Sequence, residues 1–100
     1  MIVESGIVQI RAGEEAAFEE AFARAHLLVK AAEGCLKIEL HRGIEQKSQY
    51  LLLVWWNCVE DHTERFRSSQ NFKKWRDLVG PFFATPPKVL HYEDALGSGR

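Results

Sequence analysis

The stretch Tyr50-Leu51-Leu52-Leu53-Val54-Trp55-Trp56 is apolar at every position. In an extended chain successive side chains point to opposite faces, so both faces of this stretch carry large hydrophobic groups. Short apolar runs bounded by polar residues are typical of strands that lie inside a sheet. We therefore predict a central strand over residues 50–56, with Trp55 and Trp56 on opposite faces.

The segment before this strand predicts a hairpin partner. Residues 42–48 are polar and contain Gly43, which is typical of a turn, and residues 35–42 alternate between apolar and polar side chains. A second strand is therefore expected over residues 35–42. The face expected to pack on helices carries Leu36, Ile38 and Leu40, and the opposite face carries Cys35, Lys37, Glu39 and His41.

The N-terminal third predicts a strand followed by a helix. Residues 2–10 are rich in β-branched side chains, which favours a strand in which Gly6 marks a bulge or a close approach of the backbone. Over residues 14–33 apolar side chains recur every three or four positions, which is typical of an amphipathic helix. Gly34 follows as the expected C-cap of this helix.

The C-terminal third predicts a broken helix and a last strand. Residues 59–83 have helical character interrupted near Ser68-Ser69, and Asn57 and Ser69 are candidate caps for the two pieces. The segment 88–93 is extended in pattern and is preceded by two prolines. Since proline cannot donate a ladder hydrogen bond, this strand is expected at the edge of the sheet.

The order strand, helix, strand, strand, helix, strand predicts one α+β domain over residues 1–96, with a flexible tail over 97–100. Two helices cover only one face of a sheet. Because the central strand is apolar on both faces, the second face needs cover, and a second copy of the chain is the simplest one. We therefore expect a homodimer with its sheets face to face.

Composition excludes several classes of partner. The chain has 13 Lys and Arg interleaved with 14 Asp and Glu and a formal net charge of -1, so no basic stripe is present and nucleic acid is not expected. No apolar run approaches the ~18 residues that span a bilayer, and the start lacks a signal pattern, so a cytoplasmic protein without membrane insertion is expected.

Cys35 and Cys58 lack metal-site spacing and are expected to be reduced core thiols.

A further pattern runs from the predicted central strand into the second helix. The strand ends in Trp56, the helix carries His62, serines stand at its break, and Phe72 and Trp75 follow. This arrangement resembles the antibiotic biosynthesis monooxygenase family. The segments Ile10-Arg11-Ala12-Gly13-Glu14 and Glu33-Gly34-Cys35-Leu36 are similar to weaker signatures of the family, so the resemblance covers nearly the whole chain.

The resemblance implies a ferredoxin-like, dimeric α+β barrel with a pocket between the sheet and the helices. Some relatives oxidise electron-rich aromatic or quinol substrates with molecular oxygen and without metal or flavin. A deprotonated substrate gives an electron to oxygen readily, so such a protein supplies a base, a dry pocket and orientation. Other relatives degrade haem or isomerise a signalling sugar, and membership alone does not fix the reaction.

The chain departs from the family pattern at two positions. In many members a His occupies the position where this sequence has Arg65, and His62 lies one turn earlier. The haem-degrading relatives use a His as iron ligand where this sequence has Trp75. Haem is therefore not expected, and neither a metal nor another cofactor is expected.

The second helix carries the candidate catalytic residues. His62, Arg65, Phe66 and Ser69 are spaced i, i+3, i+4 and i+7 and share one face if the segment is an α-helix. His62 is the candidate base, since the start of a helix favours the neutral imidazole, and Arg65 is a candidate for holding an anionic substrate oxygen. In the alternative, Arg65 pairs with Asp61 on the surface, Phe66 is core and His62 is a polar rim residue.

Other histidines and several aromatic residues are further candidates. Glu39 and His41 share a strand face and are either an acid/base pair or part of a dimer-interface network. His26 and His91 rank below them. The candidate substrate contacts, with the strand-end Trp placed at the pocket by the resemblance, are Trp56, Phe66, Ser69 and Trp75.

The leading hypothesis is a cofactor-independent monooxygenase that acts on a small electron-rich aromatic or quinol-like compound with molecular oxygen. The alternative is a non-catalytic small-molecule binding or accessory module on the same dimeric barrel, because an apolar pocket with one or two polar groups serves both functions. The sequence has no local triad spacing, no H-x-x-x-H pair and no glycine-rich phosphate loop, which gives hydrolase, metalloenzyme and nucleotide-dependent functions no support.

Overall fold

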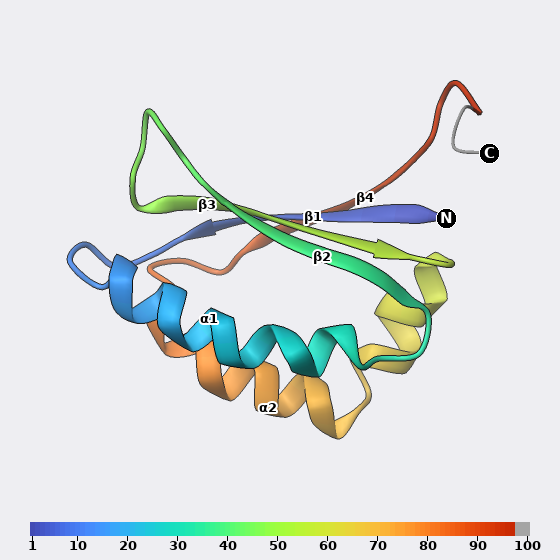
Figure 1. The fold of residues 1–100 in the computed structure, drawn as a ribbon, viewed down its shortest axis with the longest axis horizontal. Coiled ribbons are helices and arrows are strands. Elements are labelled where there is room, and N and C mark those ends of the chain that lie inside the picture. The colour runs from blue at the N-terminus through green and yellow to red at the C-terminus, as the bar shows by residue number, and fades with distance from the viewer. Residues whose placement is uncertain (98–100) are drawn as a thin grey trace.

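The computed structural model describes residues 1–97 as a four-stranded antiparallel sheet with both α-helices on one face (Figure 1). Its elements are β1 (Ile2–Gln9), α1 (Glu15–Lys30), β2 (Cys35–Arg42), β3 (Gln49–Trp56), the π-helix η1 (Asp61–Phe66), α2 (Gln70–Val79), the 3₁₀ turn η2 (Gly80–Phe82) and β4 (Lys88–Glu93). The strands lie in the order β2-β3-β1-β4. The predicted βαββαβ order and the ferredoxin-like α+β fold are confirmed.

The strand β3 lies inside the sheet, paired with β1 on one side and β2 on the other, as its two apolar faces predict. Trp55 points away from the helices and is half-buried. The side chains of β3 that face the helices are buried, and they are Tyr50, Leu52, Val54 and Trp56. The core therefore lies between this face of the sheet and the helices.

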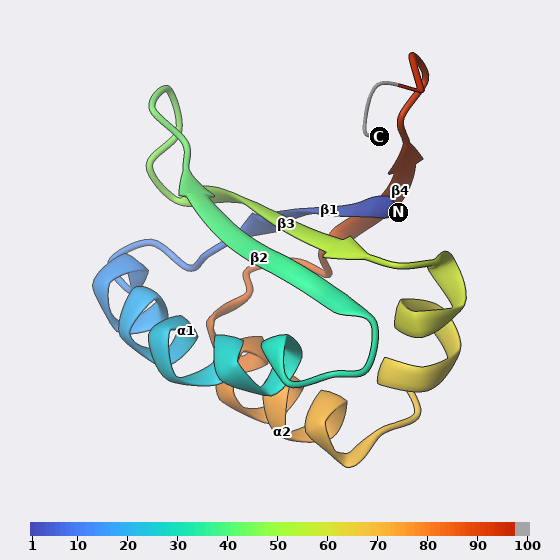
Figure 2. The ribbon, with the colours of Figure 1, turned by 45° about the vertical axis from the view of Figure 1, so that its right-hand side comes forward.

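The helix α1 lies along the sheet because its apolar side chains recur on one side. The ring of Phe18, on α1, packs edge-on against the ring of Tyr50, with the two centroids 5.0 Å apart. The helix α2 runs beside α1 (Figure 2), and its Trp75 ring lies 5.5 Å from that of Phe22. Full burial of one such side chain stabilises the fold by about 1.5–3 kcal/mol. These contacts hold both helices on the same face of the sheet.

The strand β2 differs from the predicted pattern at its start. Its register with β3 shifts between Cys35 and Lys37, which is a β-bulge, and Leu36 is left 49% exposed. The prediction that Leu36 packs on the helices is therefore wrong. The same shift turns Cys35 toward the core, where it is half-buried, whereas Cys58 is exposed. Both thiols are free, but the expectation that both lie in the core is wrong for Cys58.

The second helical region is broken as predicted, but its first piece is not an α-helix. In a π-helix an N–H bonds to the carbonyl five residues earlier. Here the Arg67 N–H donates to the His62 carbonyl at 3.1 Å. Ser69 then caps α2, because its hydroxyl accepts a hydrogen bond from the Phe72 N–H at 3.2 Å. The predicted break and the cap at Ser69 are confirmed.

The strand β4 pairs only with β1 among the described strands and forms an edge of the sheet, as its proline-rich start predicts. The chain after β4 turns away from the helices (Figure 2). Of the predicted tail, residues 98–100 lie outside the described part of the chain. None of the helices in residues 1–97 combines the length and the hydrophobicity that crossing a membrane requires.

Candidate functional site

A cavity of about 440 Å³ lies between the sheet and the helical layer. Side chains of β1, β3 and β4 form its floor, and those of η1 and α2 close it from the other side. The lining is mostly apolar and aromatic, which is typical of pockets for small organic ligands. Its aromatic members are Phe66, Phe72, Trp75 and Phe83, and its polar members are Glu4, His62 and Arg67.

Gly6 leaves space on the floor of the cavity. It lies in the middle of β1 and pairs in regular register with Leu52 and Val89, so β1 has no bulge at this position. A β-carbon at Gly6 would lie 3.7 Å from the Leu52 Cβ, which is an ordinary contact. The backbone therefore tolerates a side chain here, and the glycine adds to the volume of the cavity.

Glu4 places a carboxylate in the wall of this cavity. It lies on the helix-facing side of β1 and is 6% exposed. The indole N–H of Trp56 donates to Glu4 Oε1 at 3.0 Å. Burial raises the pKa of Glu4, and the Trp56 hydrogen bond and the charge of Arg67 offset only part of that increase. Glu4 therefore holds its proton to higher pH than an exposed glutamate does.

His62 lies next to Glu4 and is buried, so it is not the polar rim residue of the alternative interpretation. Its Nε2 is 3.5 Å from Glu4 Oε1, its Nδ1 is 2.8 Å from His91 Nε2, and its ring stacks on Trp56 with centroids 5.5 Å apart. Burial lowers the pKa of His62 to about 4, helped by the nearby charge of Arg67 and by His91. The expected neutral imidazole is present, but burial is its main cause, not the helix dipole.

Arg67 brings a positive charge to the cavity. Its side chain lines the cavity and its residue is exposed, so the guanidinium stands where the cavity meets solvent. Its charge lowers the pKa of Glu4, His62 and His91. An anionic group that enters the cavity would therefore meet an attractive field there.

The π-helix η1 explains why Arg67, and not Arg65, lies near Glu4 and His62. In a π-helix residues five apart are joined by a hydrogen bond, so His62 and Arg67 come to the same side of η1. Arg65 points away, its side chain is 61% exposed, and it donates to Asp61 at 2.9 Å. The predicted shared face of His62, Arg65, Phe66 and Ser69 does not form as a whole, because only His62 and Phe66 of the four line the cavity.

The predicted substrate contacts are divided among three places. Phe66 and Trp75 line the cavity together with His62. Trp56 is completely buried behind the cavity wall, where it holds Glu4 and stacks on His62. Ser69 caps α2 and lines, with Arg65, a separate depression of about 420 Å³.

Sequence patterns predicted neither Glu4 nor Arg67 as site residues, and they did not predict that Glu4 and His91 lie side by side. Glu4 and His91 are direct cross-strand neighbours on β1 and β4. Pairing of strands far apart in the sequence brings them together, and no local spacing signals it. The only available hint was Glu4 itself, a charged residue at an inward position of an otherwise apolar strand.

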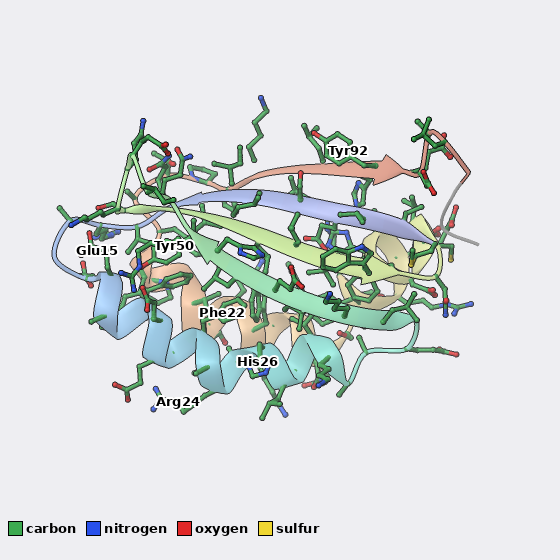
Figure 3. The ribbon with its side chains drawn as sticks, turned by 45° about the horizontal axis from the view of Figure 1, so that its top comes forward. Glu15, Phe22, Arg24, His26, Tyr50 and Tyr92 are labelled. Carbon is green, nitrogen blue, oxygen red and sulfur yellow. The ribbon has the colours of Figure 1, made fainter. Side chains whose placement is uncertain are left out.

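A second cleft, of about 740 Å³, lies between α1 and the hairpin of β2 and β3. Tyr50 points toward α1 there, on the helix side of the sheet (Figure 3). Its hydroxyl donates to Glu19 Oε2 at 2.5 Å, and Arg42 pairs with the same oxygen at 2.6 Å. These three polar side chains already bond to one another, so the cleft has fewer polar groups available to bind a ligand than the smaller cavity has.

The cluster in the smaller cavity can handle a proton and an anion. A buried carboxylate with a raised pKa and a neutral imidazole are proton acceptors, and a guanidinium stabilises the oxyanion that deprotonation leaves. Apolar walls exclude water from the reacting group. Among residues 1–97, no three His, Cys, Asp or Glu side chains are grouped so that they could hold a metal ion.

Comparisons with known proteins agree with this architecture. The family model described as antibiotic biosynthesis monooxygenase matches residues 1–78. The uncharacterized protein YczJ of Bacillus subtilis (strain 168) is 36% identical over 94 residues, which are 94% of this chain and 99% of YczJ. The match therefore spans nearly all of both chains.

Solved structures extend the likeness to the fold. A Bordetella bronchiseptica protein described with the same family name has a TM-score of 0.91 and 41% identity, covering 94% of this chain and 96% of its own. SnoaB of Streptomyces nogalater, described as a cofactor-independent oxygenase, has a TM-score of 0.83 and 14% identity, covering 99% of this chain and 97% of its own. This chain belongs to the antibiotic biosynthesis monooxygenase family.

Proposed function

We propose that the protein is a cofactor-independent oxygenase that oxidises a small electron-rich aromatic or quinol-like compound with molecular oxygen. The cavity of about 440 Å³ is the proposed site. The observation that carries the proposal is the cluster of Glu4, His62 and Arg67 set into an apolar and aromatic wall. The oxygenase activity of SnoaB, a protein of the same fold, supports it.

Anthrone, whose reactive methylene lies between two aromatic rings, illustrates the chemistry. A base in the cavity removes one proton, and the C–H electron pair remains on the substrate as an enolate. The enolate gives one electron to oxygen, the two radicals combine, and the peroxide anion takes the proton back from the base to become a hydroperoxide. Loss of water then converts the methylene to a carbonyl, so anthrone and one oxygen molecule give anthraquinone and one water. A positioned base accelerates such a step by typically 10²–10⁴-fold, about the range for general catalysis.

Oxygen consumption tests this function directly. We expect the protein to accelerate oxygen uptake with anthrone or with quinols in chelator-treated buffer, above the rate without protein. An oxygen electrode follows the gas, and absorbance follows the quinone product. If a broad panel of anthrones, quinols and phenols gives no uptake but raises the melting temperature, the protein is a binding module and the oxygenase proposal is wrong.

Filling the cavity tests its location. Gly6→Val adds a side chain at a position where a β-carbon makes only ordinary contacts, so the fold should persist. We expect kcat/KM to fall by about 10-fold or more, as when one or two methylenes crowd a pocket. Circular dichroism and the melting temperature provide the control for folding. Unchanged kinetics in a folded variant would place the reaction elsewhere on the protein.

We further propose that the functional unit is a homodimer. The sheet face opposite the helices carries apolar side chains from several strands, and Tyr92 projects from β4 on this side (Figure 3). This outer face is apolar at Val3, Ile7, Leu51, Leu53, Trp55, Leu90 and Tyr92. A second copy would cover it, with about 1,600 Å² in total buried as in stable complexes. Glu39 and His41, bonded at 2.9 Å, lie at its margin.

A charge on the outer face should dissociate the dimer. Leu51 is 38% exposed in the single chain, so Leu51→Lys leaves the fold intact but would bury an ammonium group between the two sheets. Sedimentation at low micromolar concentration should show a dimer for the original chain and a monomer for this variant. Leu27→Lys, on the exposed side of α1, is the matched control and should remain dimeric. A monomeric original chain would contradict the proposal.

A further inference from the structure

The two ring nitrogens of His62 both face protein groups. Nδ1 is 2.8 Å from His91 Nε2, which is a full hydrogen bond, and Nε2 points at Glu4 Oε1 at 3.5 Å. The ring also stacks on Trp56. To accept a proton from a ligand in the cavity, His62 would have to give up one of these contacts. The imidazole is therefore placed to orient its neighbours.

Glu4 has a different arrangement. Within residues 1–97, its contacts with the Trp56 indole and with His62 are both made by Oε1. Glu4 also lines the cavity, so its second oxygen, Oε2, is the carboxylate oxygen left to meet a ligand. The carboxyl group is held at one oxygen and has acceptor capacity at the other, which is the geometry that a positioned general base requires.

We propose that Glu4, and not His62, takes the proton from the substrate, and that the His62–His91 pair positions the carboxylate. This inference rests on the oxygenase function proposed above. Glu4 Oε2 accepts the proton from the methylene carbon, and the resulting enolate oxygen lies in the field of Arg67. Glu4 returns this proton to the peroxide anion that forms when oxygen adds, and then takes the second proton from the same carbon. The carbonyl forms as the oxygen–oxygen bond breaks, and Glu4 gives the second proton to the departing hydroxide. Water is released and the carboxylate is restored.

The groups around Glu4 suit this role. Burial raises the pKa of Glu4, which brings the carboxyl group closer to the weak acid that it must deprotonate, whereas the pKa of His62 lies at about 4. The titratable or charged groups near Glu4 are His62 from η1, Arg67 after η1, His91 from β4 and Cys35 from β2. Arg67 alone among them carries a full charge near pH 7, and it favours the ionised base.

Hydrogen exchange without oxygen separates the proton step from the oxidation. Anthrone is incubated with protein in D₂O under nitrogen, and nuclear magnetic resonance follows loss of the methylene proton signal. We expect Glu4→Gln to slow the catalysed exchange by about 10²–10⁴-fold, as loss of a general base does. The glutamine carbonyl still accepts the Trp56 hydrogen bond, so folding should persist. Glu20→Gln, at an exposed position of α1, is the matched control and should exchange at the original rate.

The pH profile distinguishes Glu4 from His62 and needs no folded Glu4→Gln variant. The exchange rate of the original protein should fall with decreasing pH through a midpoint above 4.5, the ordinary value for glutamate. His62→Gln should keep this midpoint and reduce the rate by about 10-fold, because it only loosens the carboxylate. If His62→Gln removes the pH dependence, or a folded Glu4→Gln exchanges normally, the assignment is wrong. Exchange without oxygen uptake would refute the oxygenase while leaving Glu4 as the base, and no catalysed exchange would refute both.

Discussion

Replacement of Gly34 with alanine should lower the free energy of unfolding by about 3 kcal/mol, the sum of a left-handed backbone and a steric overlap. Gly34 lies between α1 and β2 with φ of 85°. This left-handed conformation is unfavourable for any residue that has a β-carbon. A β-carbon there would also overlap the carboxylate of Asp61. Asp61 is 3% exposed and starts η1, so it cannot move without displacing the segment that carries His62.

Gly13 provides the matched control for this prediction. Its φ is 88°, almost the same as that of Gly34, but nothing lies within 4 Å of a β-carbon built there. Gly13→Ala should therefore cost only about 1 kcal/mol, the backbone part alone. Urea unfolding followed by tryptophan fluorescence, at one protein concentration, measures both variants. Equal losses would show that a β-carbon at residue 34 does not clash with Asp61, which would contradict the larger loss predicted for Gly34→Ala.

The second large effect is a loss of stability in acid that depends on His62. The folded pKa of about 4 lies below the ordinary value of 6.5, so the unfolded chain binds a proton at His62 before the folded chain does. The stabilising contribution is complete above pH 6.5 and decreases as the pH falls toward 4. The difference of about 2.5 pKa units corresponds to about 3 kcal/mol. We expect the His62→Gln variant to lose less stability over this pH range than the original chain.

The contribution of Glu4 to stability has the opposite pH dependence over part of the same pH range. Its folded pKa is raised, so its contribution is complete below the ordinary value of 4.5 and is lost as the pH rises through the folded pKa. Urea titrations of the original chain, His62→Gln and Glu4→Gln between pH 6.5 and pH 4 separate the two groups. Removing His62 should flatten the acid loss, and removing Glu4 should steepen it. If His62→Gln and the original chain have the same pH slope, His62 is not buried as a neutral imidazole.

The fold could be predicted because its main signals are local or follow directly from local ones. The apolar stretch over residues 50–56 has two faces to cover, which fixes an interior strand. Alternation in the neighbouring strands and the spacing of apolar residues in α1 then leave one arrangement of layers. The bulge that exposes Leu36 escaped prediction, since an added residue shifts the pairing without changing the alternation in the sequence.

The site was only partly predictable because it depends on contacts between distant segments. Phe66 and Trp75, two of the predicted substrate contacts, line the cavity because they are apolar residues on helical faces that point to the sheet. Arg67 was missed because the π-turn changes the helical period, and Arg65 was preferred on α-helical spacing. The role proposed for Glu4 depends on its contacts with Trp56 and His62, and the pairing of β1 with β3 brings these distant segments together.

A crystal structure of the Glu4→Gln variant with anthrone, grown without oxygen, would show directly whether the substrate binds beside residue 4. The variant should bind the substrate without deprotonating it. We predict that the rings lie in the cavity of about 440 Å³, with the methylene beside residue 4 and the carbonyl oxygen toward Arg67. Electron density for anthrone in the cleft at Glu19 and Tyr50, with the cavity empty, would contradict this placement of the active site.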